Sequence, residues 1–404
     1  MKKNIIVVLA LALLLLPLAG CALLERNEVI AAKEVDARLV EANTGFAFRL
    51  FNELLKGDEE NVFYSPASVA LALSMTYNGA AGDTEKEMAH TMGIENLTLD
   101  ELNAANKDLL TILQNPDQNV ETSIANSLWP AEGAPLVEEF TKRNEEFYNA
   151  DVTRVDFTSH DAVDIVNGWV ADNTNNRIEK LFDELKPTTR LVLVNAIFFK
   201  GGWTHTFDKE ATADADFHLP VGRRKTVPMM YQQNTLSCLE GDNFKAVRLP
   251  YGQERVSMYV FVPETELSTF TDQLTSSQWE EWLNSFSEKE DATVFLPRFS
   301  AEYKTELINP LMQLGMVAAF GGGADFSGIT PGGGWFISQI VHQANLDVNE
   351  EGTEAAAATG VAMDESAPLD PFTLRADRPF FFAICDDLTG TILFMGTITN
   401  PEVD

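Results

Sequence analysis

The sequence is poor in the residues that build metal centres and disulfide frameworks. Its 404 residues include three cysteines and five histidines, and none of them forms a CxxC motif, an HExxH motif or a Cys/His cluster. A zinc finger or a zinc protease therefore has no support, and we expect no metal and no cofactor. Downstream of the N-terminal segment only Cys238 and Cys385 remain, and the sequence leaves open whether they pair.

Basic side chains are also scarce. The chain has 29 Lys and Arg residues against 61 Asp and Glu residues, which gives a formal net charge of -32. A polyanion would be repelled by such a surface, so nucleic acid and heparin-like activators are not expected partners. The hydrophobic fraction of 45% and the charged fraction of 22% are typical of a folded globular protein. Length alone allows two or three domains.

The N-terminus has the layout of an export signal. Lys2 and Lys3 precede an uncharged apolar stretch at 5–16, and the sequence LAGC at 18–21 resembles the bacterial lipobox, in which the cysteine is lipidated. We therefore predict an exported, extracytoplasmic protein whose only membrane contact is a lipid on Cys21. Residues 1–20 are then a signal peptide, and residues 21–38 form an N-terminal tether.

Two other interpretations of this segment stay open. A plain signal peptide without lipidation would give a secreted protein. An uncleaved anchor is the second alternative, because the apolar character continues to Leu24 and approaches the ~20 residues that span a bilayer. Pro17 and Gly20 disfavour that anchor.

Hydrophobic periodicity predicts several helices along the mature chain. Phe46, Leu50 and Leu54 recur every four residues, and Ser65-Pro66 is typical of a helix start. Thr84 and Glu87 have the spacing of a capping box. We expect helices over residues 40–57, 66–79, 84–92, 99–113, 137–148, 160–172 and 267–286.

Continuous apolar runs predict strands. The run at 190–200 reads RLVLVNAIFFK, which is typical of a strand buried on both faces of a central sheet. We expect further strands over residues 62–64, 256–263 and 292–297, and two within 380–399. The chain has no internal repeat and no linker. The glycine-rich piece at 321–334 lacks the lysine of a phosphate-binding loop, so we interpret it as a surface loop.

The segment at 347–370 differs from the rest of the chain. It contains seven acidic residues and no basic one, and four alanines occupy 355–358. Alanine favours helix, so an exposed helical or disordered linker is one interpretation. Laid into a sheet, however, the face that begins at Thr353 would carry only small or apolar side chains, and Glu354 would point outward. Such a segment can sit as a loop and still be accepted as a central strand.

At this point the sequence resembles the serpin family along nearly all of the mature chain. The motifs that carry the resemblance are NVFYSPAS at 61–68, NAIFFKGGW at 195–203, NEEGTEAAAA at 349–358, ADRPFFF at 376–382, His342, LGM at 314–316, FMG at 394–396 and NP at 400–401. The resemblance implies one mixed α/β domain over residues 39–404 with three β-sheets and eight or nine helices. It also implies a reactive-centre loop at about 350–371 that can insert into the central sheet.

The resemblance implies a function as well as a fold. In that mechanism a target serine protease, or alternatively a cysteine protease, attacks the exposed loop and forms its acyl-enzyme; the cut loop then inserts into the sheet and traps the protease. Such a protein is not an enzyme, has no catalytic residues of its own, and is expected to be a monomer. The alternative within the family is a non-inhibitory carrier or chaperone-like protein. A lipid-anchored hydrolase and a solute-binding lipoprotein are alternatives from other classes.

Site residues follow from the matching motifs. The resemblance places the hinge of the loop at Glu350, Glu351, Gly352, Thr353, Glu354, Ala355, Ala356, Ala357 and Ala358. It places a polar cluster beneath the opening sheet at Ser65, Ser68, Asn195 and His342, with Trp203 as the aromatic at the top of the sheet. Plain core packing explains Trp203 equally well.

The family's spacing from the hinge glycine places the reactive bond at Ser366-Ala367. Glu365-Ser366 and Met363-Asp364 stay open as alternatives, because the interval from Gly352 to Pro379 is about two residues longer than in a known inhibitory member. A small residue before the bond suits an elastase-like or subtilisin-like protease, and methionine suits a chymotrypsin-like or subtilisin-like one. Glutamate would require a protease selective for it.

Overall fold

The computed structural model describes residues 35–56, 60–114, 119–353 and 371–402. The signal peptide, Cys21, most of the tether and the loop from Glu354 to Asp370 lie outside the described residues, so the predicted reactive bond does too. Within the described ranges, no helix combines the length and the apolar character needed to cross a bilayer.

Nine α-helices form within the described residues, in agreement with the expected eight or nine. They are α1 (Ala37–Leu55), α2 (Pro66–Tyr77), α3 (Gly82–Met92), α4 (Leu99–Leu113), α5 (Glu138–Tyr148), α6 (Ala162–Asn173), α7 (Leu267–Thr271), α8 (Ser276–Leu283) and α9 (Ile308–Gln313). The Ser65-Pro66 start is confirmed: the Ser65 side chain accepts a hydrogen bond from the N–H of Ser68, and Pro66 opens α2.

Two of the helix predictions were wrong in detail. The single helix expected over 267–286 is two short helices, because Thr275 caps α8 by accepting a hydrogen bond from Gln278. The capping box assigned to Thr84 and Glu87 does not form, because the cap of α3 is Ala81 and makes no side-chain bond.

The polar side chains of Thr84 and Glu87 instead hold a distant loop. Thr84 accepts a hydrogen bond from the N–H of Asp325, and Glu87 accepts two, from the N–H groups of Val317 and Ala318. A capping box is present at the start of α4, where Thr98 and Glu101 satisfy each other's backbone N–H groups.

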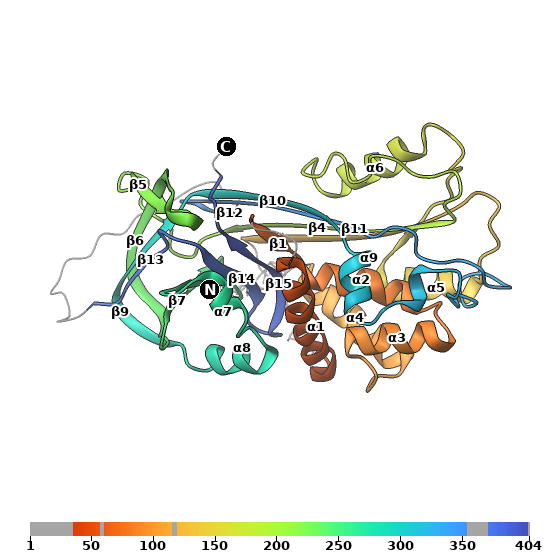
Figure 1. Cartoon of the computed structure of the whole chain (residues 1–404), viewed down its shortest axis with the longest axis horizontal. Helices are drawn as coiled ribbons and strands as arrows, with labels where there is room; N and C mark the ends of the chain where they lie inside the picture. The colour runs from red at the N-terminus through yellow and green to blue at the C-terminus, as the bar shows by residue number, and fades with distance from the viewer. Residues whose placement is uncertain (1–34, 57–59, 115–118, 354–370, 403–404) are drawn as a thin grey trace, which may run out of the picture.

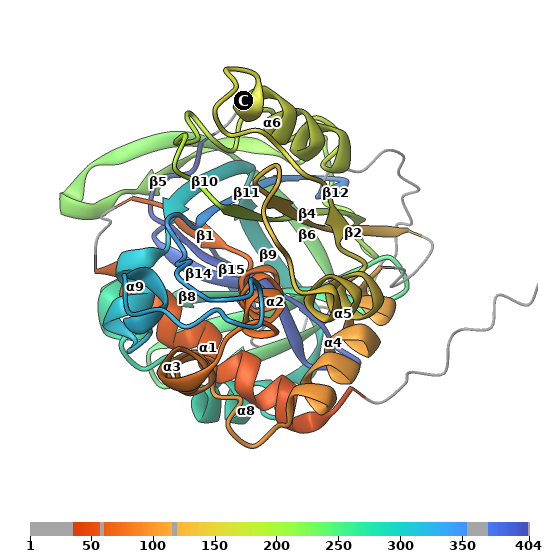
Figure 2. The ribbon, with the colours of Figure 1, turned by 90° about the vertical axis from the view of Figure 1, so that its right-hand side faces the viewer.

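A six-stranded sheet runs through the middle of the molecule, in the order β10-β11-β12-β4-β2-β3. Its strands are β10 (Phe299–Glu306), β11 (Val341–Asn349), β12 (Gly352–Thr353), β4 (Leu191–Gly202), β2 (Val120–Pro130) and β3 (Asp151–Val152). Figure 1 shows α6 on one face of this sheet and α1 to α5 on the other, and Figure 2 shows the same layers from the end. The prediction that the strand at 190–200 is central and covered on both faces is confirmed.

The remaining strands form a nine-stranded sheet in the order β1-β15-β14-β8-β7-β6-β9-β13, with β5 also paired to β6. They are β1 (Val62–Tyr64), β5 (Ala213–His218), β6 (Arg224–Glu240), β7 (Phe244–Tyr251), β8 (Val256–Pro263), β9 (Ser287–Pro297), β13 (Thr373–Arg375), β14 (Phe380–Asp386) and β15 (Thr391–Ile398). Hydrogen bonding therefore gives two sheets within the described residues where we expected three. The cause is β6, whose 17 residues pair with β5 at one end and with β7 at the other, and so join two groups of strands.

The main core lies between the nine-stranded sheet and helices α1 and α8. Aromatic rings concentrate there: Phe261 contacts Trp279, Trp282 and Phe381 with ring centroids 5.4 to 5.9 Å apart. Such pairs add about 0.5–1.5 kcal/mol each beyond the area they bury. Cys238 and Cys385 are buried in this core as free thiols, so the structure shows no disulfide between them.

Candidate functional site: the centre of the six-stranded sheet

A strand of only two residues, β12, occupies the centre of the six-stranded sheet. Gly352 pairs with Gly202 of β4 on one side and with Asn349 of β11 on the other. Thr353 pairs in the same way with Gly201 and Val348. β12 is antiparallel to both neighbours, and it is the last described piece of chain before residue 354.

Beyond β12, β4 and β11 continue as neighbours without backbone pairing to each other along their described lengths. Two small cavities, of about 30 and 20 Å³, lie along this seam. One is lined by Asn195 and His342 among others, and the other by Ile197 and Asn345. Each has room for about one or two water molecules, so the seam is only loosely closed.

Unpaired polar groups line the same seam. The side-chain oxygens of Ser68, Asn195 and Asn345 are buried and have no hydrogen-bond partner within the described protein. Buried polar atoms without a protein partner are uncommon in folded proteins and mark places that are satisfied by water or by another segment. The sheet is therefore weakest along the line that continues from β12.

Gly352 allows β12 to enter the sheet. Its φ angle is +149°, which side chains rarely adopt, and a β-carbon there would lie 2.2 Å from the carbonyl oxygen of Gly201. The two residues of β4 that face β12 are also glycines, Gly201 and Gly202. The close approach of the two backbones requires the absence of a side chain at position 352.

Thr353 is the first inward-facing residue of the hinge. Its side chain is 1% exposed, and its hydroxyl lies 2.9 Å from the hydroxyl of Tyr251. Tyr251 in turn stacks on Trp203 with ring centroids 4.3 Å apart, and the Trp203 indole N–H donates to the carbonyl of Asn349 at 2.9 Å. Thr353 thus faces the interior, and Trp203 lies at the entry of the hinge into the sheet. The inward face expected for the residues after Thr353 stays a prediction.

An ion pair fixes Glu350, the first residue of the two-residue turn between β11 and β12. The Glu350 side chain is 3% exposed, and its carboxylate accepts hydrogen bonds from Arg298 at 2.6 Å and from Thr212 at 2.8 Å. Burial raises the pKa of Glu350, but these hydrogen bonds outweigh burial and leave the pKa below its ordinary value of 4.5. The neighbouring Glu351 pairs with Lys209 near the surface.

The predicted polar cluster lies beneath the seam. The backbone N–H of Ser65 donates to the Nε2 atom of His342 at 3.1 Å. Burial lowers the pKa of His342 to about 4, so the imidazole is neutral at physiological pH. Its ring bonds a backbone N–H group rather than a serine hydroxyl, which is a structural arrangement and not that of a general base.

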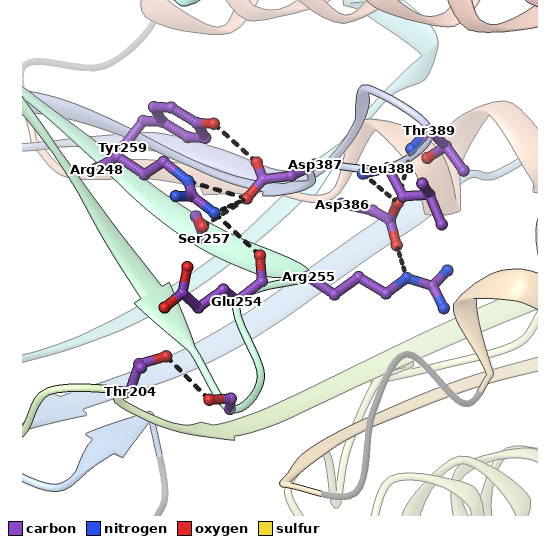
Figure 3. Close-up of polar contacts among 11 residues, drawn as sticks. Thr204, Arg248, Glu254, Arg255, Ser257, Tyr259, Asp386, Asp387, Leu388 and Thr389 are labelled. Atoms are coloured by element: carbon purple, nitrogen blue, oxygen red, sulfur yellow. Dashed lines mark hydrogen bonds and ion pairs between the residues drawn. The ribbon is translucent and has the colours of Figure 1, made fainter. Parts of the chain in front are cut away.

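A polar network holds the turn that joins β7 to β8, directly after Tyr251 (Figure 3). In this network Asp387 accepts hydrogen bonds from Arg248, Ser257 and Tyr259, at distances of 2.6 to 3.1 Å. Beside it the fully buried carboxylate of Asp386 pairs with Arg255 at 2.8 Å. These contacts tie the β7–β8 turn, which begins directly after Tyr251, to the β14–β15 turn.

Comparisons with known proteins agree with this geometry. A family model described as serpin (serine protease inhibitor) matches residues 41–401. The chain belongs to the serpin family. A serpin-like protein of Methanosarcina acetivorans is 35% identical over 407 residues, covering 95% of this chain and 92% of that protein. The family supports a function of the protease-inhibitor or serpin-like kind.

Solved serpin structures have the same fold. The thermophilic serpin tengpin in its native state has a TM-score of 0.84 and 28% identity, covering 92% of this chain and 96% of that one. A complex of thyroxine-binding globulin with thyroxine has a TM-score of 0.82 and 28% identity, covering 90% of this chain and 100% of that one.

The structure brings most of the predicted site residues of this serpin into one region, along the seam and at its top. Ser65, Ser68, Asn195 and His342 lie beneath the seam, and Trp203 lies at the entry of the hinge. Their roles in loop insertion stay a prediction. Hinge positions 354–358, the reactive bond and Cys21 lie outside the described residues. No group of metal-ligating side chains occurs in the described part of the chain.

Sequence reasoning missed three contributors to this site: Tyr251, Arg298 and Asn126. No motif in the sequence assigned Tyr251 to the site. Arg298 follows β9 and reaches Glu350 across 52 residues of sequence, and Asn126 accepts a hydrogen bond from Asn195 across 69 residues. A single basic residue after a strand is a weak signal, so only the tertiary contact identifies it.

Proposed function

We propose that this serpin is a suicide-substrate inhibitor of serine proteases. A target protease cleaves the reactive-centre loop and forms an acyl-enzyme; the cut loop then inserts between β4 and β11 as a full strand and traps the enzyme. The observation that carries the proposal is β12, which already occupies the position of that strand and pairs with both neighbours.

The register of β12 supports insertion along the whole of β4. Gly352 faces Gly202 and Thr353 faces Gly201, so each further residue would face the preceding residue of β4. In that register Met363 would face Leu191, the first residue of the strand. The stretch from Thr353 to Met363, which carries only one charge, is therefore as long as the gap, and the acidic residues 364 and 365 begin just beyond its end.

Insertion in this register is energetically favourable for these side chains. Each inserted residue gains ladder hydrogen bonds worth about 0.5–1.5 kcal/mol net. Alanine, glycine and threonine side chains avoid the overpacking penalty of about 1–3 kcal/mol that larger ones would meet in a closing sheet. Glu354, the single charge, would alternate to the face opposite Thr353.

For the reactive bond we propose Ser366-Ala367, with Glu365 and Met363 as the alternative residues before the bond. The loop contains no Lys or Arg between Asp347 and Asp370, so a trypsin-like protease has no suitable bond there. Elastase-like, subtilisin-like and chymotrypsin-like enzymes are the proposed targets, and cysteine proteases are a further class to test.

The test is a denaturing gel after mixing the full chain with elastase, subtilisin, chymotrypsin, trypsin and a papain-like protease. We expect a complex that survives SDS with at least one of the first three, and none when the protease serine is blocked beforehand. Mass spectrometry of the released C-terminal peptide should identify residues 367–404. Cleavage of the loop without a stable complex by any protease would contradict the proposal.

That contradictory result would favour the second candidate, a non-inhibitory carrier or chaperone-like serpin. The match to thyroxine-binding globulin in complex with thyroxine supports it, because it shows a serpin of this fold that holds a small ligand. Inhibition is favoured by Gly352 and Thr353, which already pair with both neighbouring strands, and by the small side chains that follow them in the sequence.

We also propose that the protein is exported, lipidated at Cys21 and monomeric. The sequence before the described residues supports export and lipidation, with its basic start, apolar stretch and terminal LAGC. Radiolabelled fatty acid should be incorporated into the wild-type chain and not into a Cys21→Ser variant. Incorporation that is equal in the two would contradict lipidation at Cys21.

A further inference from the structure

The hairpin formed by β5 and β6 ends in an unusual turn, which we call the hairpin tip and define as residues 219–223. Val221 in this turn is 95% exposed, the largest exposure among the exposed large apolar side chains within the described ranges. Its φ angle is +62°, in the left-handed region, and the following Gly222 has a φ of +73°. Two successive left-handed residues are typical of a turn that favours Asn-Gly.

A valine at position 221 stabilises neither the backbone conformation of this turn nor the packing around it. A β-branched side chain is strained at positive φ, where Gly and Asn are the common residues. Full exposure means that the apolar side chain buries no surface within the protein. A residue that is unfavourable on both counts is better explained by contact with something outside the chain.

The strand that leads into the hairpin tip contacts the chain just beyond β13, the strand that follows the reactive-centre loop. His218, the last residue of β5, donates its backbone N–H to the carbonyl of Asp377 at 2.7 Å, two residues beyond β13. β13 is the first strand after residue 370, and Figure 1 shows β5, β6, β9 and β13 together at one end of the molecule. A protease that engages the loop therefore comes close to the tip.

The charge of the tip is opposite to that of the protein as a whole. Arg223, Arg224 and Lys225 are consecutive in a chain with a net charge of -32. Arg224 pairs with Asp216 at 3.2 Å and Lys225 donates to the carbonyl of Pro401, whereas no carboxylate among the described residues pairs with Arg223. An exposed valine two residues from a guanidinium that has no carboxylate partner among the described residues suits a partner surface that is partly apolar and acidic.

We infer that the hairpin tip is a contact site for the target protease, separate from the reactive bond. Val221 enters an apolar depression beside the active-site cleft of the protease, and Arg223 faces a carboxylate on its rim. The inference rests on the proposed inhibitory function. It adds that the hairpin tip helps to determine which proteases are inhibited rapidly. Contacts of this kind raise the rate of encounter and leave the chemistry of the loop unchanged.

The first variant is Val221→Asn, measured with the protease that forms the stable complex. We expect the second-order rate constant of inhibition to fall about tenfold. The number of inhibitor molecules consumed per protease should stay the same, and the thermal unfolding midpoint should stay or rise because asparagine fits the turn. Val317→Asn is the matched control, since Val317 is 51% exposed and lies next to α9, away from the tip.

The second variant is Arg223→Glu, measured at several salt concentrations. We expect a loss of rate of about tenfold at low salt that becomes smaller as salt is added, because the contact is between exposed charges. Unchanged rates in both tip variants, with a stable complex still formed, would overturn the hairpin tip alone and leave the proposed function standing. Absence of any complex with the wild-type chain would overturn both.

Two further outcomes would assign the tip to another partner and overturn the inference. One is a dimer, seen by analytical ultracentrifugation, that dissociates in the Val221→Asn variant. The other is faster inhibition on addition of heparin that depends on Arg223.

Discussion

The hydroxyl groups of Tyr251 and Thr353 lie 2.9 Å apart in the interior of the protein. Thr353 belongs to the hinge of the reactive-centre loop, and Tyr251 is the last residue of β7, so this hydrogen bond joins the mobile element of the proposed mechanism to the nine-stranded sheet. The polar network of Asp386 and Asp387 holds the turn that follows Tyr251. The start of the hinge is therefore bound at a defined position in the six-stranded sheet, between β4 and β11.

Replacing Thr353 with arginine should convert the inhibitor into a substrate. The side chain is 1% exposed, so an arginine there would bury an unpaired charge or force β12 out of the sheet. We expect cleavage of the loop to continue while the SDS-stable complex is lost. Thr353→Ser, which keeps the hydroxyl, should still form the complex. A complex formed equally by the arginine variant would show that the hinge is assigned to the wrong residues.

Gly352→Ala tests the close approach of β12 to β4. The added β-carbon would lie 2.2 Å from the Gly201 carbonyl oxygen, so we expect a loss of stability of about 1–3 kcal/mol and more inhibitor consumed per protease. Urea unfolding and titration of protease activity measure the two effects. Gly168→Ala is the control, because a β-carbon there meets nothing within 4 Å and lies inside α6, where alanine is favourable. Equal behaviour of the two variants would contradict the prediction.

The ion pair of Glu350 and Arg298 should stabilise the hinge. In a double-mutant cycle to alanine we expect a coupling free energy of about 1–3 kcal/mol at pH 7, because Glu350 is buried while Arg298 is partly exposed. The pKa of Glu350 is lower in the folded state, so this stability is present above its ordinary pKa of 4.5 and is lost as pH falls through the folded value. Urea unfolding at pH 7 and below pH 4.5 measures the coupling. A coupling that stays constant across this range would contradict the assignment.

His342 should make the fold less stable in mild acid. Its pKa is lowered from 6.5 to about 4 in the folded state, so the unfolded chain takes up a proton first as pH falls. Neutral His342 therefore leaves the free energy of unfolding undiminished above pH 6.5. As pH falls from 6.5 toward 4, that free energy decreases by at most about 3 kcal/mol. A His342→Gln variant, whose amide oxygen can accept from Ser65, should lack this component of the pH dependence. The measurement is urea unfolding of both proteins between pH 4 and pH 7. If the free energy of unfolding changes equally with pH in the two proteins, the prediction is contradicted.

Local signals predicted much of the fold because the physics that decides a helix or a strand acts within about ten residues. The apolar run at 190–200 and the Ser65-Pro66 start gave β4 and α2 nearly at their observed bounds. The Thr275 cap was overlooked, and the result was one long helix in place of α7 and α8. The Thr84–Glu87 spacing misled for a different reason, since both side chains serve contacts with residues more than 200 positions away.

The candidate site divides in the same way. Gly352 and Thr353 were identified from a motif and a period of two, both of which are local patterns. Tyr251 and Arg298 were not, because their roles depend on which strands the topology places beside the hinge. The register of β12 on β4, which gives the length of the proposed insertion, also follows only from the folded sheet.

The strand β9 holds both ends of the reactive-centre loop. Its residues 293–295 pair with β13 after the loop, and Arg298, the residue following it in sequence, binds Glu350 before the loop. Beyond β13 the chain continues into β14 and β15 in the interior of the nine-stranded sheet. A cut within the loop would thus leave two polypeptides that share one core. We expect the cleaved protein to travel as a single particle in native solution and to separate into two chains only when it is unfolded.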